Sequence, residues 1–291
     1  MKITEGTRVS IIGVGLIGSS ILDAFAQSEY KNFIAIDVSQ ESLDKALQAI
    51  KDNLFRLVER EKIDKERMNL ILGKIKTSTN LQDAKDSEVV IESIYEDSEI
   101  KKDFFREICK IVSRDCLILS NTSAISITDL SSAVENPDRF AGMHFFKPVP
   151  VRKLAEINQG LNTSDETVER VKDLGAILGL TPVVCKDTPC FIISRLLNAL
   201  LYEAILLVEE GKATPKDIDT AVRLGLGHPM GPLELFDFLD AIPLVCHVFE
   251  YMEKEIDSKW KPPRLLRSMT RAGWHGKASG RGFYDYSKPE K

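Results

Sequence analysis

The sequence is poor in the residues that mark several classes of protein. Its 291 residues include five cysteines, an odd number, and no two of them are spaced as Cys-x-x-Cys. This pattern argues against a disulfide framework and against a zinc site, and it favours a reducing compartment. The 17 glycines and 12 prolines make up about a tenth of the chain, which excludes collagen-like and disordered proteins.

Positive charge is not in excess either. The chain has 39 Lys and Arg against 44 Asp and Glu, a formal net charge of −5 and an isoelectric point near 5.6. This balance gives no general attraction for nucleic acid or anionic lipid, so neither is an expected partner. The most apolar stretch, 191–208, contains Arg195, Asn198 and Glu203, which are costly in hydrocarbon. We therefore expect a buried helix there. We also expect a cytoplasmic protein, or alternatively a mature protein of the mitochondrial matrix or another organelle whose leader has been removed.

Strand and helix patterns alternate through the first 186 residues. The apolar segments typical of strands are 8–12, 33–36, 88–91, 117–120, 140–146, 154–158 and 182–184. The helical patterns between them cover about 16–27, 40–72, with a break near 62–64, 98–112 and 164–179. This alternation predicts an α/β, Rossmann-like domain with a mostly parallel, doubly wound sheet.

The character of the chain changes after Lys186. A helical pattern at 190–210 is apolar nearly all round, another follows at 215–223, and no convincing strand precedes the C-terminal tail. We therefore predict two domains, 1–186 and 187–291, of which the second is smaller and all-α. A helix that is apolar all round must be buried in its own domain or against a second copy, so we expect a homodimer through the second domain.

A glycine-rich turn follows the first predicted strand and begins the first helix. It reads Gly13-Val14-Gly15-Leu16-Ile17-Gly18, and Asp37 ends the next strand. The first glycine permits a tight turn, the second lets the backbone approach a pyrophosphate, and the third lets helix and strand pack closely. Asp37 can accept hydrogen bonds from both ribose hydroxyls and would repel a 2′-phosphate. The pattern predicts NAD rather than NADP, and the alternative is a glycine turn without a ligand.

One histidine stands where a proton acceptor would be needed. A nicotinamide-dependent enzyme that oxidises an alcohol requires a base beside the reacting oxygen. His144 ends a predicted strand, a common place for ligand-facing residues in open α/β sheets, and a chain reversal near Pro150 could bring Glu156 to it. The carboxylate would then fix the ring tautomer and stabilise the imidazolium. The spacing equally allows a histidine that caps the strand and a solvated glutamate.

Several short segments, taken in order, point to one family. They are the glycine loop with Asp37, Ser120-Asn121-Thr122-Ser123, His144-Phe145-Phe146-Lys147-Pro148-Val149-Pro150, Lys153-Leu154-Ala155-Glu156, Gly227-His228-Pro229-Met230-Gly231-Pro232 and Gly280-Arg281-Gly282-Phe283-Tyr284-Asp285-Tyr286. With them the chain resembles the short-chain L-3-hydroxyacyl-CoA dehydrogenases and the bacterial 3-hydroxybutyryl-CoA dehydrogenases over about residues 8–287. The resemblance implies reversible, NAD-dependent oxidation of an L-3-hydroxyacyl-CoA to a 3-ketoacyl-CoA, as in fatty-acid β-oxidation.

The resemblance also implies roles for single residues. His144 is the general base, Glu156 orients it and balances its charge, and Ser123 contacts the substrate oxygen beside the nicotinamide. The residues on the cofactor side are Gly13, Gly15, Leu16, Ile17, Gly18, Asp37, Glu96, Lys101 and Ser123. Arg56 and Arg60, one helical turn apart, would hold CoA. On spacing alone, two arginines in a helix that also carries glutamates are more typical of a solvated surface.

Three positions depart from the family pattern. Lys147 replaces an Asn on the nicotinamide side, offers donors only, and would depress the basicity of His144 if its ammonium pointed inward. Ser194 replaces an Asn that positions the substrate, and its shorter hydroxyl reaches less far unless a water bridges the gap. Cys190 replaces a Gly, and we expect a small buried side chain at a helix start.

Two other functions stay open on the sequence alone. The chain could be a binding protein that retains affinity for NAD or acyl-CoA with weakened catalysis, as in the recruited lens crystallins of this superfamily. It could also be a sister dehydrogenase that acts on a free hydroxy acid or sugar acid. The presence of Ser123, His144 and Glu156 together favours the working enzyme.

Overall fold

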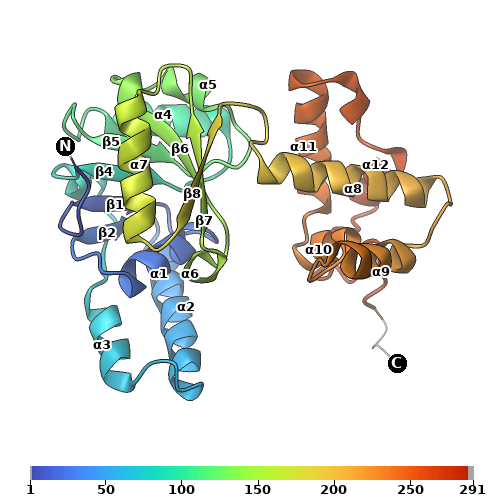
Figure 1. Cartoon of the computed structure of the whole chain (residues 1–291), viewed down its shortest axis with the longest axis horizontal. Helices are drawn as coiled ribbons and strands as arrows, with labels where there is room; N and C mark the ends of the chain where they lie inside the picture. The colour runs from blue at the N-terminus through green and yellow to red at the C-terminus, as the bar shows by residue number, and fades with distance from the viewer. Residues whose placement is uncertain (1, 288–291) are drawn as a thin grey trace. The chain divides into compact units, whose positions relative to one another are not determined.

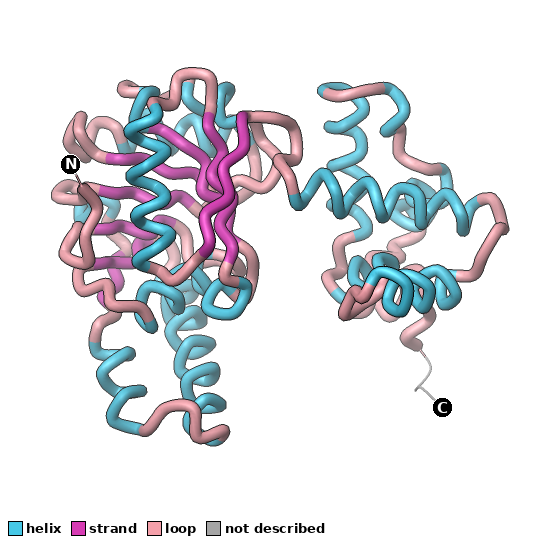
Figure 2. Tube along the Cα trace, in the orientation of Figure 1, coloured by secondary structure: helices cyan, strands magenta, loops and turns pink. Residues whose placement is uncertain are grey.

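The computed structural model describes residues 2–287. The chain divides into two compact units, 1–191 and 192–291. Figure 2 shows the eight described strands in the first unit, whereas the second consists of helices and loops. The predicted α/β domain followed by a smaller helical domain is thereby confirmed.

The strands of the N-terminal unit form one sheet in the order β3-β2-β1-β4-β5-β6-β7-β8. Neighbouring strands are parallel except β6 and β7, which are antiparallel. The strands are β1 (Val9–Ile12), β2 (Phe33–Ile36), β3 (Lys76–Ser78), β4 (Val89–Glu92), β5 (Leu117–Ser120), β6 (Phe140–Phe145), β7 (Leu154–Gln159) and β8 (Thr181–Lys186). The sequence does not predict β3, because its three residues are Lys, Thr and Ser.

Helices cover both faces of this sheet, because successive strand residues point to opposite faces. Val89 and Ile91 of β4 belong to a core with α1, α2 and α7, whereas Val90 belongs to a second core with α4 and α5. Figure 1 shows α7 in front of the sheet and α4 and α5 behind it. The helices are α1 (Gly18–Gln27), α2 (Gln40–Glu59), α3 (Lys65–Gly73), α4 (Ser98–Ile108), α5 (Ile127–Ser131), α6 (Val149–Arg152) and α7 (Asp165–Ile177), with short 3-10 helices η1 (Leu81–Ala84) and η2 (Pro137–Arg139).

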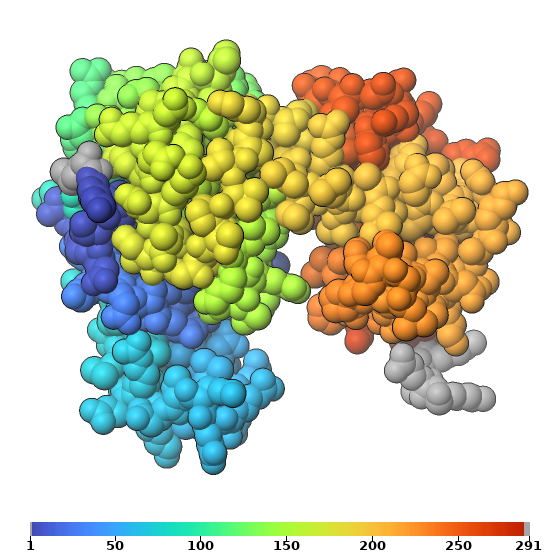
Figure 3. All heavy atoms as spheres, viewed as in Figure 1, coloured from blue at the N-terminus to red at the C-terminus, as the bar shows by residue number. Residues whose placement is uncertain are grey.

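The long helical pattern at 40–72 is two helices with a turn between them, as the predicted break requires. In α2 the buried residues are Leu43, Ala46, Ile50 and Leu54, which form one stripe at helical spacing. Most other residues of α2 face solvent, and Figure 3 shows the region of α2 and α3 standing out from the rest of the N-terminal unit. The segment 147–150, near which the sequence allows a chain reversal, contains the start of the short helix α6.

The C-terminal unit contains α8 (Ile193–Glu209), α9 (Pro215–Leu226), α10 (Pro232–Phe238), α11 (Ile242–Glu255), α12 (Arg264–Arg271) and the 3-10 helix η3 (Ser258–Trp260). Tyr202 of α8 packs edge-on against Phe249 and Trp260, and its hydroxyl donates to the Lys259 carbonyl at 2.6 Å. This aromatic cluster joins α8, α11 and η3. None of the helices in the described chain is both long enough and apolar enough to cross a membrane.

Two buried carboxylates hold the glycine-rich segments of the C-terminal unit. Asp219 accepts hydrogen bonds from the Leu233 and Glu234 amides at the start of α10 and from the Tyr284 hydroxyl. Asp237 accepts from the Phe283 and Tyr284 amides. A Cβ at Gly231 would collide with Asp219, and a Cβ at Gly282 would collide with Asp237. The glycines are therefore required by the close approach of each carboxylate.

The segment before α8 differs from the expected helix start. The helix begins at Ile193, and Cys190 and Phe191 before it have φ values of 63° and 49°. Cys190 is fully buried as expected, but its backbone lies in the left-handed region that favours glycine. Along α8, Leu196 is 64% exposed, so the helix is not covered on every side by its own chain.

Candidate active site

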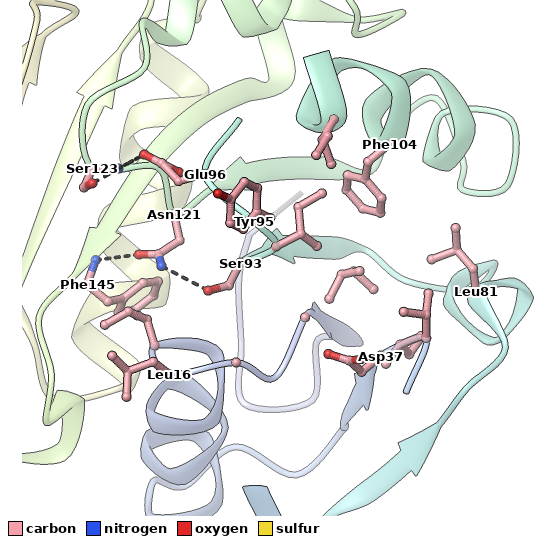
Figure 4. Close-up of a pocket in the computed structure, with 18 of the residues that line it drawn as sticks. Leu16, Asp37, Leu81, Ser93, Tyr95, Glu96, Phe104, Asn121, Ser123 and Phe145 are labelled. Carbon is pink, nitrogen blue, oxygen red and sulfur yellow. Dashed lines mark hydrogen bonds between the residues drawn. The ribbon is translucent and has the colours of Figure 1, made fainter. Parts of the chain in front are cut away.

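A cavity of about 870 Å³ lies in the N-terminal unit where β1, β2, β4, β5 and β6 end. The residues that line it next to these strand ends are Ile12, Gly13, Ile36, Asp37, Ser93, Ile94, Asn121, Ser123, His144 and Phe145. Open α/β sheets bind ligands at the carboxyl ends of their strands, where the strand order reverses. Figure 4 shows Ser123, Glu96, Asn121 and Phe145 on one side of the cavity and Asp37, Leu81 and Phe104 on the other.

The glycine loop shapes the floor of the cavity. Gly13 has a φ of 86°, and a Cβ there would come within 2.6 Å of the Ser93 carbonyl oxygen. A Cβ at Gly18 would collide with the Gly13 carbonyl, whereas a Cβ at Gly15 would meet no atom within 4 Å. Helix α1 begins without a side-chain cap at Ile17. Open space at Gly15 beside an uncapped helix N-terminus suits the pyrophosphate of a dinucleotide.

Asp37 is held beside this loop. Its Oδ2 accepts a hydrogen bond from the Val14 amide and its Oδ1 accepts one from the Ser39 amide, both at 2.9 Å. Each carboxylate oxygen can accept a further hydrogen bond, and the side chain lines the cavity. The position suits an acceptor for ribose hydroxyls.

His144 and Glu156 form a buried pair. The two residues stand directly opposite each other in the antiparallel register of β6 and β7, and His144 Nδ1 lies 2.7 Å from Glu156 Oε2. Glu156 is 1% exposed, and His144, at 7%, lines the cavity. A carboxylate at Nδ1 fixes the tautomer with the proton on that nitrogen, which makes Nε2 the basic atom of the ring.

Ser123 is held by Glu96. The Ser123 amide donates to Glu96 Oε1 at 2.8 Å, the Ser123 hydroxyl lies 3.4 Å from the same oxygen, and the Thr122 hydroxyl donates to it at 2.6 Å. Ser123 and Glu96 both line the cavity, and Figure 4 shows their side chains close together. The serine hydroxyl therefore faces the cavity from a fixed backbone position.

Lys101 supports Glu96 from behind. Its side chain is 1% exposed, and its ammonium pairs with Glu96 Oε2 at 3.2 Å and with the buried carboxylate of Glu92. Burial raises the pKa of Glu92, against the opposing effect of the Lys101 ammonium. Lys101 does not line the cavity, but its ammonium contacts two residues that do, Glu96 and the carbonyl of Ile94.

Asn121 is a site residue that the sequence analysis did not single out. Its Oδ1 accepts from the Phe145 amide at 2.9 Å and its Nδ2 donates to Ser93 Oγ at 3.1 Å. The side chain thus fixes the end of β6 against the loop after β4, as Figure 4 shows. A signal was present, because three small polar residues, Asn121, Thr122 and Ser123, directly follow strand β5. The other residues missed include Tyr95, Phe104 and Glu107.

Besides Gly18, Lys101 and Glu156, four of the predicted site residues do not line this cavity. Lys147 is exposed, and it is not among the residues that line the cavity beside His144. Arg56 and Arg60 are exposed on α2 and at its C-terminal end. Ser194 belongs to the C-terminal unit, in the first turn of α8, where its carbonyl accepts from Asn198. The roles expected for these residues stay predictions.

Comparison with known protein families decides the assignment. The model of the 3-hydroxyacyl-CoA dehydrogenase NAD-binding domain matches residues 8–188, and that of the 3-hydroxyacyl-CoA dehydrogenase C-terminal domain matches residues 191–286. The chain belongs to the 3-hydroxyacyl-CoA dehydrogenase family. The expected NAD cofactor and the expected class, an NAD-dependent dehydrogenase, are confirmed.

Individual relatives agree over nearly the whole chain. A probable 3-hydroxybutyryl-CoA dehydrogenase of Deinococcus radiodurans is 40% identical over 96% of this chain and 100% of its own length. The human mitochondrial hydroxyacyl-coenzyme A dehydrogenase is 37% identical over 96% of this chain and 91% of its own. The crystal structure of (S)-3-hydroxybutyryl-CoA dehydrogenase from Ralstonia eutropha has a TM-score of 0.92 and 38% identity, covering 97% of this chain and 99% of the other.

Proposed function

We propose that this family member oxidises the hydroxyl group of an L-3-hydroxyacyl-CoA to a ketone, reversibly and with NAD. The observation that carries the proposal is the buried His144–Glu156 pair at the end of a dinucleotide-type cavity that Ser123 also lines. NAD, when bound, supplies the hydride acceptor. The acyl-CoA substrate follows from family membership and from the names of the relatives.

The proton is handled by His144. With Nδ1–H donating to Glu156, Nε2 accepts the hydroxyl proton of the substrate as the carbonyl forms. The resulting imidazolium is stabilised by the adjacent carboxylate, which is 1% exposed and therefore interacts with little screening by water. In the reducing direction the same nitrogen returns the proton to the oxygen.

Ser123 positions the oxygen on which this proton transfer takes place. Its hydroxyl lies 3.4 Å from Glu96 Oε1, a long and therefore weak hydrogen bond that a substrate oxygen can replace. The hydrogen bond from the Ser123 backbone amide to Glu96 keeps the backbone fixed while the hydroxyl rotates. Ser123 therefore donates to the reacting oxygen from a position set by β5 and Glu96.

Other residues of the cavity hold the cofactor. Gly15 and the start of α1 receive the pyrophosphate, Asp37 accepts from the ribose hydroxyls next to the adenine, and Glu96 lies at the nicotinamide end with Ser123. The negative charge of Asp37 disfavours a 2′-phosphate and so favours NAD over NADP. For the substrate we propose that Arg56 and Arg60 bind CoA phosphates and that Ser194 contributes to positioning the acyl group.

We also propose a homodimer formed through the C-terminal unit. Large apolar side chains are exposed on this unit, which favours a covering partner. They include Leu196, Leu207, Leu224, Leu226, Phe238, Leu239 and Leu244. Sedimentation at micromolar concentration tests the proposal, and a monomer at all concentrations would exclude it.

The five cysteines are free thiols, and three of them are buried. Free thiols are typical of proteins that work in a reducing compartment, and we propose such a compartment, the cytoplasm first and the mitochondrial matrix second.

The direct test of the function is an assay with NADH and two substrates, followed by absorbance. We expect acetoacetyl-CoA to be reduced and free acetoacetate to be reduced far more slowly. Binding of NADH without turnover of either substrate would support a binding protein instead. Preferential reduction of free keto acids would support the sister dehydrogenase.

A further inference from the structure

The cavity continues well beyond Asp37, to an end that the mechanism does not use. This end is lined by Val38, Thr79, Leu81, Ile100, Phe104 and Glu107. Most of these side chains are apolar, yet Val38 is 97% exposed and Ile100 is 48% exposed. Exposed apolar side chains that converge on a cavity favour a ligand with a flat apolar surface.

One carboxylate stands among these apolar residues. Ile100, Phe104 and Glu107 lie at positions i, i+4 and i+7 of α4, which places all three on one face of the helix. The helix begins at Ser98, close in sequence to Glu96 at the nicotinamide end, and each residue advances it by about 1.5 Å. Glu107, nine positions later, therefore lies at the opposite end of the cavity.

The Glu107 carboxylate is exposed, and it has no hydrogen bond or ion pair with another residue of the described chain. By contrast, two other acids of α4, Glu99 and Asp103, pair with Lys102 and Arg106 of the same helix. Glu107 is thus an acceptor at the rim of an apolar slot, and its lone pairs are available to a ligand.

We propose that Glu107 is a specificity-determining residue for the base of the dinucleotide, accepting a hydrogen bond from the 6-amino group of adenine. The proposal rests on NAD binding as proposed above. Adenine is flat and largely apolar, and its exocyclic amino group is a donor that matches a carboxylate. Val38, Leu81, Ile100 and Phe104 enclose the ring, and Glu107 reads the substituent at carbon 6.

This arrangement distinguishes adenine from hypoxanthine. Hypoxanthine has a carbonyl oxygen at carbon 6, which accepts hydrogen bonds and would face the negative Glu107. A hydrogen bond to a charged acceptor at a partly exposed rim corresponds to a preference of about tenfold. A glutamine at 107 can either accept from the amino group or donate to the carbonyl, so it would not discriminate.

The test compares NAD with nicotinamide hypoxanthine dinucleotide as cofactors. We expect the wild type to show a kcat/KM about tenfold higher with NAD, and Glu107→Gln and Glu107→Ala to reduce this ratio to near one. Glu99→Gln removes the same charge from the same helix outside the cavity and should keep the wild-type ratio. A ratio that is the same in the wild type and in both Glu107 variants would overturn the proposal.

Binding separates this proposal from the proposed function. Dissociation constants of NADH and of its reduced hypoxanthine analogue, measured by fluorescence, give the ratio even if no acyl-CoA is turned over. Loss of turnover with a retained, Glu107-dependent ratio would overturn the function and support the role of Glu107. Turnover with a wild-type ratio near one would support the function and overturn the role of Glu107.

Discussion

His144 and Glu156 show how far single residues can be assigned from sequence. The strand-end position of His144 and the reversal near Pro150 predicted that the two side chains could meet, and they lie directly opposite each other in β6 and β7. The sequence could not decide between this pair and a solvated glutamate, because the burial of Glu156 depends on the packing of β8 and α7 beside β7. Asn121 was missed because its role is to bond the backbone of β6, far along the chain.

Ser194 can be tested by restoring the residue of the family pattern. We expect Ser194→Asn to raise kcat/KM for a short acyl-CoA severalfold, because the longer amide reaches further and one additional hydrogen bond stabilises by about 1 kcal/mol. Steady-state assays with acetoacetyl-CoA provide the measurement, and Ser194→Ala is the control for loss of the hydroxyl. Unchanged or lower activity of Ser194→Asn would show that the site has adapted to serine.

Cys190 stands where the family has a glycine, and its backbone conformation makes the effect of this replacement on stability testable. A glycine is favoured where φ is +63°, whereas a side chain there is strained by about 1–2 kcal/mol. We expect Cys190→Gly to change the free energy of unfolding by less than about 1 kcal/mol, because relief of strain offsets lost burial. Cys190→Val, β-branched in the same conformation, should cost about 2 kcal/mol or more. Denaturant titration measures both, and a Gly variant less stable than the Val variant would contradict this account.

At the scale of elements, the sequence predicted most strands and helices within a few residues. It failed where an element depends on its neighbours. The polar strand β3 exists because it extends the sheet beside β2. Helix α6 packs against α1, and the Val149 amide donates a hydrogen bond to Ser20 Oγ of α1 at 2.9 Å. Such elements have no apolar period of their own to read.

The contact between α10 and the C-terminal segment can be tested at Asp237. Its carboxylate accepts the Phe283 and Tyr284 amides and so fixes the C-terminal tail to α10. Asp237→Asn places an NH₂ group against one of these donors, and we expect a loss of about 1–3 kcal/mol in stability. Thermal unfolding of the variant, with the exposed Glu255→Gln as control, measures it. Equal stability of the two variants would show that the tail is held by other contacts.

At the scale of the whole molecule, a net charge of −5 is at odds with a substrate that carries several negative charges. The conflict is resolved if a local basic patch attracts CoA, and Arg56 and Arg60 lie exposed one turn apart on the protruding α2. The sequence predicted that these arginines lie one helical turn apart. It did not predict their surroundings, which depend on how the buried stripe of α2 packs against the sheet domain.

The binding of CoA phosphates by Arg56 and Arg60 can be tested by neutral substitutions. We expect Arg56→Gln with Arg60→Gln to raise the KM for acetoacetyl-CoA about tenfold at low ionic strength, with a smaller effect at high salt. The KM for acetoacetyl-pantetheine, which lacks the CoA phosphates, should not change. A similar increase with both substrates would contradict a phosphate-binding role.

The central claim is that His144, held by Glu156, is the acid and base of an NAD-dependent dehydrogenase. The most direct measurement is the turnover of acetoacetyl-CoA by His144→Gln, together with its dissociation constant for NADH. The account predicts a fall in kcat of about 10²–10⁴-fold with NADH affinity within about twofold of the wild type. Turnover near the wild-type rate would contradict it.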